Sequence, residues 1–242
     1  MKISTQKSNE ITDDSRFQAD QMFGGTITAR IYNAGRKFIS SEYMPKDHVK
    51  EFISQIEPGQ TAVELGSGNR RLRRDIVTVD LFPFPNVAIV ADIIKTPFPD
   101  NAVDFIILDT VLEHVPDPFK VIAECRRILK PKGRMICITP FIFPYHGYPK
   151  HFYNFSEDGL RYIFRDFSEC KVEMNMGPTS SLINLTSEYF AVAFSGNSKF
   201  MYTLCKGLAL VPIFLFKYLD IFWAGRKKAN RIASHLCVLA TK

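Results

Sequence analysis

Acidic residues stand at the ends of four predicted β-strands, where parallel sheets bind their ligands. Glu64 ends the first apolar run and is followed by the turn Gly66-Ser67-Gly68-Asn69. Asp80, Asp92 and Asp109 follow the next three runs in chain order. Because the carboxyl ends of parallel strands meet at one edge of a sheet, a single ligand could contact all four acids. Carboxylates there can accept hydrogen bonds from ribose hydroxyls and from an exocyclic amine, which predicts a nucleoside ligand.

Short apolar runs alternate with helical patterns along the chain, which is typical of parallel βαβ construction. The clearest helix covers Pro118 to Leu129, with Phe119, Ile122, Cys125 and Leu129 on its apolar face. Other helices are predicted over Thr26–Ser40, over Pro45–Ile56 and from Ser156, as N-cap, to Phe164. The predicted strands are Thr61–Leu65, Ile76–Asp80, Val87–Ala91, Val103–Asp109, Arg134–Thr139, Cys170–Met176 and Leu236–Ala240.

The glycine turn differs from a dinucleotide site. The pattern GxGxxG requires a glycine where Arg71 stands, and Gly66 lies only 14 residues before Asp80. Dinucleotide folds place the acid about 20 residues further on, so the first crossover helix is expected to be reduced to a turn or two. We interpret the arginines of this link as a solvated face, with a phosphate-binding patch as the alternative; they are Arg70, Arg71, Arg73 and Arg74.

The ordered segments ELGSGN, VDL, ADI, TPFPD, VDFIILDTVLEHV and LKPKGR resemble the class I S-adenosylmethionine (SAM)-dependent methyltransferases, especially a branch with LEHV after the fourth strand. The resemblance covers roughly residues 55–170. It implies a doubly wound α/β fold with a mostly parallel seven-stranded sheet. The last strand would run antiparallel between the fifth and sixth, after a helical insertion. Arg70 replaces the third glycine that this family usually has.

The resemblance also implies which residues hold SAM. The end of the first strand and the glycine turn would bind the amino-acid part of SAM. The end of the second strand would bind its ribose, and the end of the third strand would bind its adenine. The end of the fourth strand would lie beside the sulfonium. Acidic lining suits that positive charge. The residues are Glu64, Gly66, Ser67, Gly68, Asn69, Asp80, Leu81, Asp92, Ile93, Asp109 and Thr110.

A loop rich in aromatics and histidines follows the fifth strand, from Thr139 to Ser156. It resembles a loop of bacterial methyltransferases linked to surface-glycan and lipid pathways. His146 is predicted as a general base toward an acceptor hydroxyl, because imidazole titrates near neutrality. The alternative is a histidine that only hydrogen-bonds the loop. His114, His151, Tyr145 and Tyr153 are weaker candidates, and no metal site is expected.

Residues 200–231 combine aromatic and basic residues between the last two predicted strands. Their longest uncharged stretch, Gly207 to Phe216, has ten residues, whereas a membrane-spanning helix needs about 20. Two interpretations stay open. The segment forms a lid or dimer face, or it lies on a membrane surface with its basic residues toward anionic headgroups.

Composition fits one globular chain of 242 residues, with 46% hydrophobic and 23% charged residues and a formal net charge of +6. Five scattered cysteines without a CxxC pair predict neither a disulfide framework nor a zinc knuckle. We expect a cytoplasmic protein, either free or peripheral at the inner face of a membrane. The expected organisation is a mobile leader (1–22), helices (23–58), a SAM-binding core (59–177), a helical insertion (178–234) and the last core strand (235–242).

The predicted function is methyl transfer from SAM to an oxygen of a small molecule or of a lipid or glycan intermediate. A DNA amino-methyltransferase is disfavoured because Asp109-Thr110-Val111-Leu112 replaces its N/D-P-P-Y/F motif. Two alternatives remain at this point. One is a non-catalytic SAM-fold scaffold at a membrane complex, and the other is an RNA or protein methyltransferase. The sequence does not define an oligomeric state.

Overall fold

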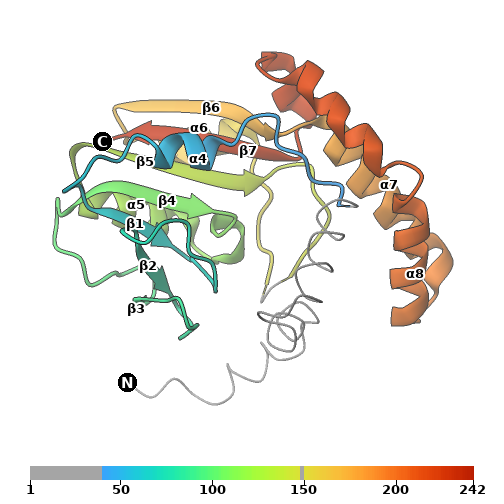
Figure 1. The fold of residues 1–242 in the computed structure, drawn as a ribbon, viewed down its shortest axis with the longest axis horizontal. Helices are drawn as coiled ribbons and strands as arrows, with labels where there is room; N and C mark the ends of the chain where they lie inside the picture. Colours follow the sequence, from blue (N-terminus) through green and yellow to red (C-terminus); the bar gives the residue numbers. More distant parts are fainter. Residues whose placement is uncertain (1–39, 148–149) are drawn as a thin grey trace.

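The computed structural model describes residues 40–147 and 150–242. The predicted leader and nearly all of the helix predicted over 26–40 lie outside these residues. The helices and strands, which Figure 1 labels where there is room, are α4 (His48–Ile53), β1 (Ala62–Leu65), β2 (Val77–Asp80), β3 (Ile89–Val90), β4 (Val103–Asp109), η1 (Leu112–His114), α5 (Pro118–Ile128), β5 (Leu129–Pro140), α6 (Glu157–Ile163), β6 (Glu169–Met176), α7 (Pro178–Ser195), α8 (Lys199–Leu210), η2 (Phe214–Trp223), η3 (Lys227–Ile232) and β7 (His235–Thr241).

The described strands form one seven-stranded sheet with the order β3-β2-β1-β4-β5-β7-β6. Strands β1 to β5 pair in parallel, whereas β7 runs antiparallel to both β5 and β6. The predicted fold is therefore confirmed, including the position of the last strand. Strand β7 is apolar along most of its length because it lies inside the sheet and is covered on both faces.

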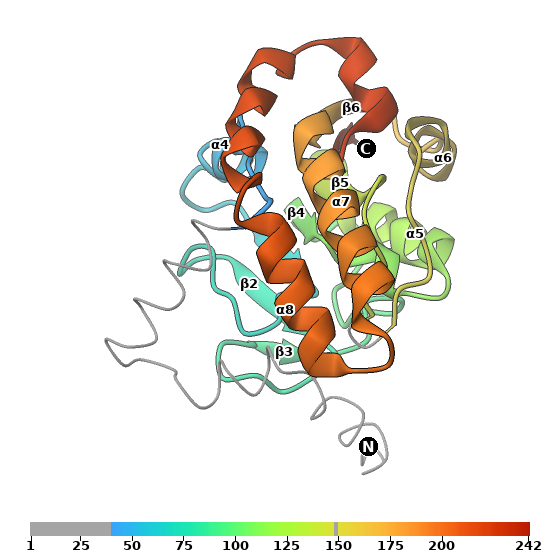
Figure 2. The same cartoon turned by 90° about the vertical axis from the view of Figure 1, so that its right-hand side faces the viewer.

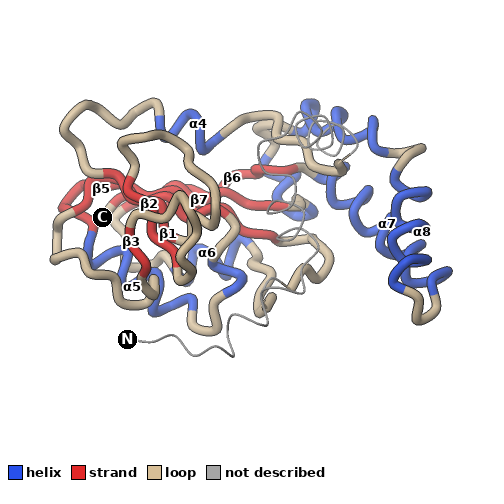
Figure 3. Tube along the Cα trace, turned by 60° about the horizontal axis from the view of Figure 1, so that its bottom comes forward, coloured by secondary structure: helices blue, strands red, loops and turns tan. Residues whose placement is uncertain are grey.

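Alternate residues of β4 supply two separate cores, as the two-residue period of a strand requires. Ile106 and Leu108 belong to the cluster that contains α5 and α6 side chains. Phe105 and Ile107 belong to the cluster that includes Phe52 of α4. Figure 3 shows the same arrangement, with α4 on one side of the sheet and α5 and α6 on the other.

Helix α5 begins where the sequence predicts, because Pro118 follows the N-cap Asp117, whose carboxylate accepts a hydrogen bond from the Lys120 amide. Its predicted apolar face was partly wrong. Phe119 is 45% exposed and stacks edge-on against Tyr162 of α6, whereas Val121 and Ile128 take buried positions instead.

The link between β1 and β2 contains only turns, so the prediction of a shortened crossover helix was wrong. The eleven residues from Gly66 to Ile76 are too few to form a helix and also return the chain to the amino end of the sheet. At the other end of the α5 crossover, β5 begins directly at Leu129. The turn Lys130–Gly133 forms an irregularity inside β5, where the register to β4 shifts.

The insertion between β6 and β7 is helical. Helices α7 and α8 form a hairpin beyond the carboxyl ends of the parallel strands (Figures 1 and 2). In the part of the chain that the structure describes, no helix has the length and apolar character needed to cross a membrane. This agrees with the charges noted in the sequence of residues 200–231.

A buried carboxylate of η2 binds the start of α7, the first helix of this insertion. Asp220 of η2 is fully buried and accepts hydrogen bonds from the Thr179 and Ser180 amides at the start of α7, at 2.7 and 3.0 Å. It thereby satisfies two donors that a helix N-terminus leaves free. Gly177 permits this approach, because a Cβ atom there would lie 2.5 Å from the Asp220 side chain.

The buried His235 of β7 predicts a pH-dependent stability. Burial lowers the pKa of His235 to about 3, from an ordinary value of 6.5. The unfolded chain therefore binds a proton that the folded protein excludes, and stability is lost as the pH falls below about 6.5. Between pH 7 and pH 5 this residue alone should reduce the free energy of unfolding by about 2 kcal/mol.

Urea unfolding of the wild type and His235→Gln at both pH values checks this prediction. The variant should show a pH dependence smaller by that amount, because glutamine does not titrate. His48 is also buried, and its lowered pKa contributes equally to both proteins. An identical pH dependence in the two proteins would contradict the assignment.

Candidate functional site

The turn after β1 is shaped by glycines at positive φ. Gly66 has φ +72° and Gly68 φ +56°, a region that residues with a Cβ rarely adopt. A Cβ on Gly66 would also lie 2.5 Å from the Val111 side chain. The amides of Gly66 and Ser67 both donate to the Val79 carbonyl, so the turn closes against β2. The predicted glycine turn therefore lies directly beside the end of the second strand.

Asp80 joins this turn to β2. Its Oδ2 accepts a hydrogen bond from the Gly68 amide at 2.7 Å, and its Oδ1 accepts from the Phe82 amide at 3.0 Å. Each carboxylate oxygen has two acceptor positions, so one position on each oxygen remains available to a ligand. The carboxylate is held in a fixed orientation before any ligand binds.

Arg70 forms a bridge between Glu64 and Asp109. Its Nε and Nη2 donate to Glu64 Oε1 at 3.0 and 2.6 Å, and its Nη1 donates to Asp109 Oδ2 at 2.6 Å. Burial raises the pKa of Glu64, and the charge of Arg70 opposes this effect. The interpretation of all four arginines as a solvated face was wrong for Arg70, because the site acids lie within its reach.

The neighbouring arginines behave differently. Arg71 is exposed, and its side chain donates to the Arg74 carbonyl at 2.9 Å. Arg73 is half-buried, pairs with Asp75 at 2.6 Å and donates to the Ile53 carbonyl. These contacts hold the link between β1 and β2 in place of the missing helix.

The predicted adenine residues follow β3, the strand next to β2. Asp92 Oδ1 accepts a hydrogen bond from the Ile94 amide at 3.0 Å. Ile93 is buried in the main core, so only its backbone is available to a ligand. Leu81 is 37% exposed and leaves an apolar surface after the end of β2.

The chain leaves β4 through a strained residue. Thr110 has φ +57°, an outlier for a β-branched residue. Its amide donates to the Ile138 carbonyl at 2.9 Å, and its hydroxyl donates to the Asp109 carbonyl at 2.7 Å. Such strain often marks functional sites and directs the chain here into η1, which carries Glu113 and His114.

His146 lies next to η1, although it is 32 residues from His114 in the sequence. The two imidazole rings have centroids 5.1 Å apart, and Nε2 of each lies 3.8 Å from Oε1 of Glu113. Sequence reasoning did not select Glu113, although the segment LEHV contains it. Glu113 is buried where the loop after β5 packs against η1, a contact between segments that are distant in the sequence.

The remaining aromatic candidates have bound polar atoms or high exposure. His151 Nε2 contacts the Tyr153 carbonyl at 2.9 Å, and burial lowers the pKa of His151. Tyr153 donates its hydroxyl to the Pro116 carbonyl at 3.0 Å. Tyr145 is largely exposed.

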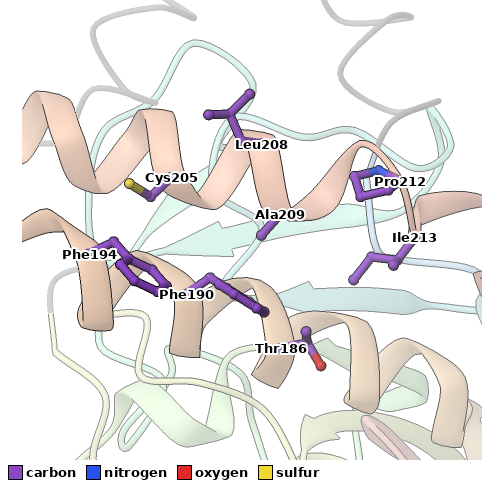
Figure 4. A pocket seen from close by; sticks show the side chains of 8 residues that line it. All are labelled: Thr186, Phe190, Phe194, Cys205, Leu208, Ala209, Pro212 and Ile213. Atoms are coloured by element: carbon purple, nitrogen blue, oxygen red, sulfur yellow. The ribbon is translucent and has the colours of Figure 1, made fainter.

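An apolar groove of about 390 Å³ lies between α7 and α8. Figure 4 shows side chains from the two helices and from the segment after α8 turned toward it. The groove belongs to the insertion and contains none of the predicted cofactor residues. Its lining residues are Thr186, Phe190, Phe194, Cys205, Leu208, Ala209, Pro212 and Ile213.

Residues 51–137 match a family described as "Methyltransferase domain". Over 79 residues the chain is 38% identical to a ubiquinone/menaquinone biosynthesis C-methyltransferase of Rickettsia akari, covering 32% of each protein. Over 71 residues it is 30% identical to a demethylmenaquinone methyltransferase of Lysinibacillus sphaericus, covering 29% of this chain and 30% of that protein. The chain thus matches about a third of the length of these curated relatives.

Solved structures share the fold over nearly the whole chain. A SAM-dependent methyltransferase from Archaeoglobus fulgidus has a TM-score of 0.53 at 17% identity, covering 95% of this chain and all of that one. A SAM-dependent methyltransferase from Thermotoga maritima has a TM-score of 0.51 at 16% identity, covering 93% and 99%. At such identities the similarity concerns the fold.

Removing the Arg70 side chain should lower the free energy of unfolding. Arg70→Ala leaves Glu64, which is 1% exposed, as a buried carboxylate without its cation. We expect a loss of about 1 kcal/mol in the free energy of unfolding at pH 7, at the low end for a buried group because Arg70 is itself 42% exposed. The loss should shrink at acidic pH, where Glu64 becomes protonated.

Urea unfolding at pH 7 and pH 4.5 measures both effects. Arg71→Ala is the matched control, since this exposed side chain bonds only to a backbone carbonyl in the same turn. Equal losses for the two alanine variants would show that the bridge contributes nothing of its own.

Proposed function

We propose that this chain, whose residues 51–137 match a methyltransferase domain family, is a SAM-dependent methyltransferase of class I. In this proposal it transfers the methyl group of SAM to an oxygen of a small molecule or of a lipid or glycan intermediate. The observation that carries the proposal is the connected group of Glu64, Arg70, Asp80 and Asp109 with the glycine turn, at the carboxyl edge of the sheet. Ligands of open α/β sheets bind at this edge.

We assign the parts of SAM along this edge in the order of the strands. Asp80 receives the ribose hydroxyls on its free acceptor positions, and Leu81 with Asp92 and the Ile93 backbone receive the adenine. The turn from Gly66 to Asn69 receives the amino-acid part.

Glu64, Asp109 and Thr110 complete the methionine end of this assignment. Arg70 is an addition to the assignment made from the sequence. Its guanidinium lies between the two acids and is 42% exposed, so it can offer a cation to the carboxylate of SAM.

The acceptor lies, in this proposal, beside the loop after β5. His146 Nδ1 contacts the Pro144 carbonyl at 3.2 Å, so this nitrogen carries the ring proton and Nε2 has a free lone pair. We assign His146 as the base that removes the proton of an acceptor hydroxyl during attack on the methyl group. The rest of the rate acceleration would come from aligning the acceptor oxygen with the methyl group of SAM and from excluding water.

Methylation of carbon is the second candidate, and the matched relatives favour it. Their names refer to C-methylation in quinone biosynthesis, over a segment that is 38% identical to this chain. That segment covers a third of each relative. An aromatic acceptor with an ionisable hydroxyl would suit both chemistries.

The insertion has an unusual distribution of side chains that favours an apolar acceptor or a lipid surface. Helix α7 buries mainly small and polar residues, including Ser180, Asn184 and Ser187. Its larger side chains are exposed, among them Tyr189 at 70% and Phe194 at 65%. Exposed apolar surface of this extent marks an interaction site.

A basic cluster lies beside Pro178, the first residue of α7. Arg226, Lys227 and Lys228 line a second apolar cavity with Trp223, and the side chain of Arg226 lies over the indole ring at 5.1 Å. Aromatic side chains beside a basic cluster suit anionic headgroups. We therefore propose that the insertion contacts a membrane surface from which a lipid-linked acceptor is taken.

Binding of S-adenosylhomocysteine, measured by isothermal titration calorimetry, tests the proposed function. The wild type should bind one equivalent, and Asp80→Asn should bind at least tenfold more weakly, because it removes a charge-assisted acceptor of the ribose. Asp75→Asn, an exposed acid paired with Arg73, serves as control and should bind like the wild type. Absence of binding by folded wild-type protein would refute the proposal and favour a scaffold role.

Flotation with liposomes tests the membrane contact. The wild type should float with vesicles that contain anionic lipid, and a much smaller fraction of it should float with neutral vesicles. The double variant Lys227→Glu/Lys228→Glu should lose most of this binding, because each basic residue near an anionic surface contributes about 1 kcal/mol. Lys46→Glu/Lys50→Glu, at helix α4, is a matched charge control. Equal flotation of both double variants would contradict the assignment of the basic cluster.

A further inference from the structure

Glu113 is buried without a hydrogen-bond partner. Its side chain is 0% exposed, and neither carboxylate oxygen has a hydrogen-bond partner among the described residues. A carboxylate taken out of water without compensation is strongly unfavourable, so such a group requires a cation or a proton nearby. The other buried carboxylates near this end of the sheet, Glu64, Asp80 and Asp220, each accept hydrogen bonds on at least one oxygen.

The groups nearest to Glu113 are two imidazole nitrogens. Nε2 of His114 and Nε2 of His146 each lie 3.8 Å from the same oxygen, Glu113 Oε1. This distance is too long for a hydrogen bond, which has about 2.7–3.2 Å between its heavy atoms. The ligand atoms of the three residues all lie within 4.8 Å of one another.

The opposite nitrogens of both rings are held by backbone carbonyls. His114 Nδ1 lies 2.6 Å from the Lys150 carbonyl, and His146 Nδ1 lies 3.2 Å from the Pro144 carbonyl. A carbonyl oxygen only accepts, so in the neutral imidazole each Nδ1 carries the ring proton and each Nε2 presents a lone pair. Two lone pairs and a carboxylate oxygen that face one another repel unless a proton or a metal cation lies between them. The Nδ1–carbonyl contact is also the usual support of a metal-binding histidine.

We propose that Glu113, His114 and His146 bind a divalent first-row transition-metal ion. Two imidazoles and one carboxylate form a donor set suited to Zn²⁺, Fe²⁺ or Mn²⁺. Ligand atoms at about 2.1 Å from a tetrahedral ion lie about 3.4 Å apart. The two 3.8 Å separations, and the third separation of at most 4.8 Å, therefore need an inward movement of the side chains when the ion binds. Three protein ligands leave a fourth position open, as in catalytic metal sites.

This site was not expected from the sequence, which suggested no metal. Glu113 and His114 follow β4, whereas His146 follows β5, and no short ligand spacing connects them. The parallel pairing of β4 and β5 brings the two segments together.

A role for the ion follows only if the proposed methyl transfer is correct. The open position would bind the acceptor oxygen and lower the pKa of its hydroxyl, as metal ions do for bound water. In the loaded site His146 is then a ligand and no longer the base, because its Nε2 lone pair is used. The metal site itself does not depend on this role.

Calorimetry with ZnCl₂ and MnCl₂ on the EDTA-treated full-length protein, in the absence of SAM, tests the site. We expect one equivalent to bind. Glu113→Gln, His114→Ala and His146→Ala should each bind at least tenfold more weakly, the effect of losing a ligand or its support. Visible absorption of the Co²⁺-loaded protein should report the coordination geometry, and His146→Ala should alter that spectrum.

His151→Ala is the matched control. Its ring centroid lies 4.2 Å from that of His146, but its two nitrogens contact the His146 amide and the Tyr153 carbonyl. This variant should bind metal like the wild type. The site is refuted if the folded wild type binds no ion, or if His146→Ala and His151→Ala bind equally well. Binding of S-adenosylhomocysteine by the metal-free protein separates a failure of the metal site from a failure of the proposed function.

Discussion

A charged side chain that leaves water must have a partner, and this constraint organises the carboxyl edge of the sheet. Glu64 is paired with Arg70, and Asp80 is held by two backbone amides. In the insertion, Asp220 is held by the start of α7. Each of these contacts fixes the position of a segment. The Glu64–Arg70 pair holds the turn after β1, Asp80 holds the chain after β2, and Asp220 holds η2 against the start of α7. The edge is therefore prepared for a polar ligand before the ligand arrives.

The insertion differs from an ordinary packed helix, since most of the larger side chains of α7 are exposed. An ordinary surface helix buries its apolar stripe. Here the small buried side chains allow η2 and η3 to approach α7 closely, while Tyr189 and Phe194 stay exposed. The core is consequently complete without these residues. One domain thus combines a polar carboxyl edge of the sheet with exposed apolar side chains on its insertion.

The sheet was predictable from the sequence because its signals are local. The apolar runs, the N-caps Asp117 and Ser156, and the order of the acids fix most strands and helices within a residue or two. The exceptions are β5, which begins five residues before its predicted start, and α4, which is three residues shorter at each end than predicted. What escaped prediction depends on contacts between distant segments. Arg70 reaches Glu64 and Asp109 only because β1 and β4 are neighbours. Glu113 meets His146 only because β4 and β5 are paired. Phe119 has the apolar character of a core residue but lies beside α6 on the surface.

The insertion begins and ends on two strands that are already paired. The Ser234 amide donates to the Met176 carbonyl at 2.9 Å, and Met176 is in register with His235. The pairing of β6 with β7 therefore brings the two ends of the insertion together, whatever the length of the insertion. Doubling the length of a flexible closed loop costs only about 0.6 kcal/mol. Helices of another size or character could thus replace α7 and α8 with little effect on the sheet beneath them, so the exposed surface of the insertion can change independently of the carboxyl edge.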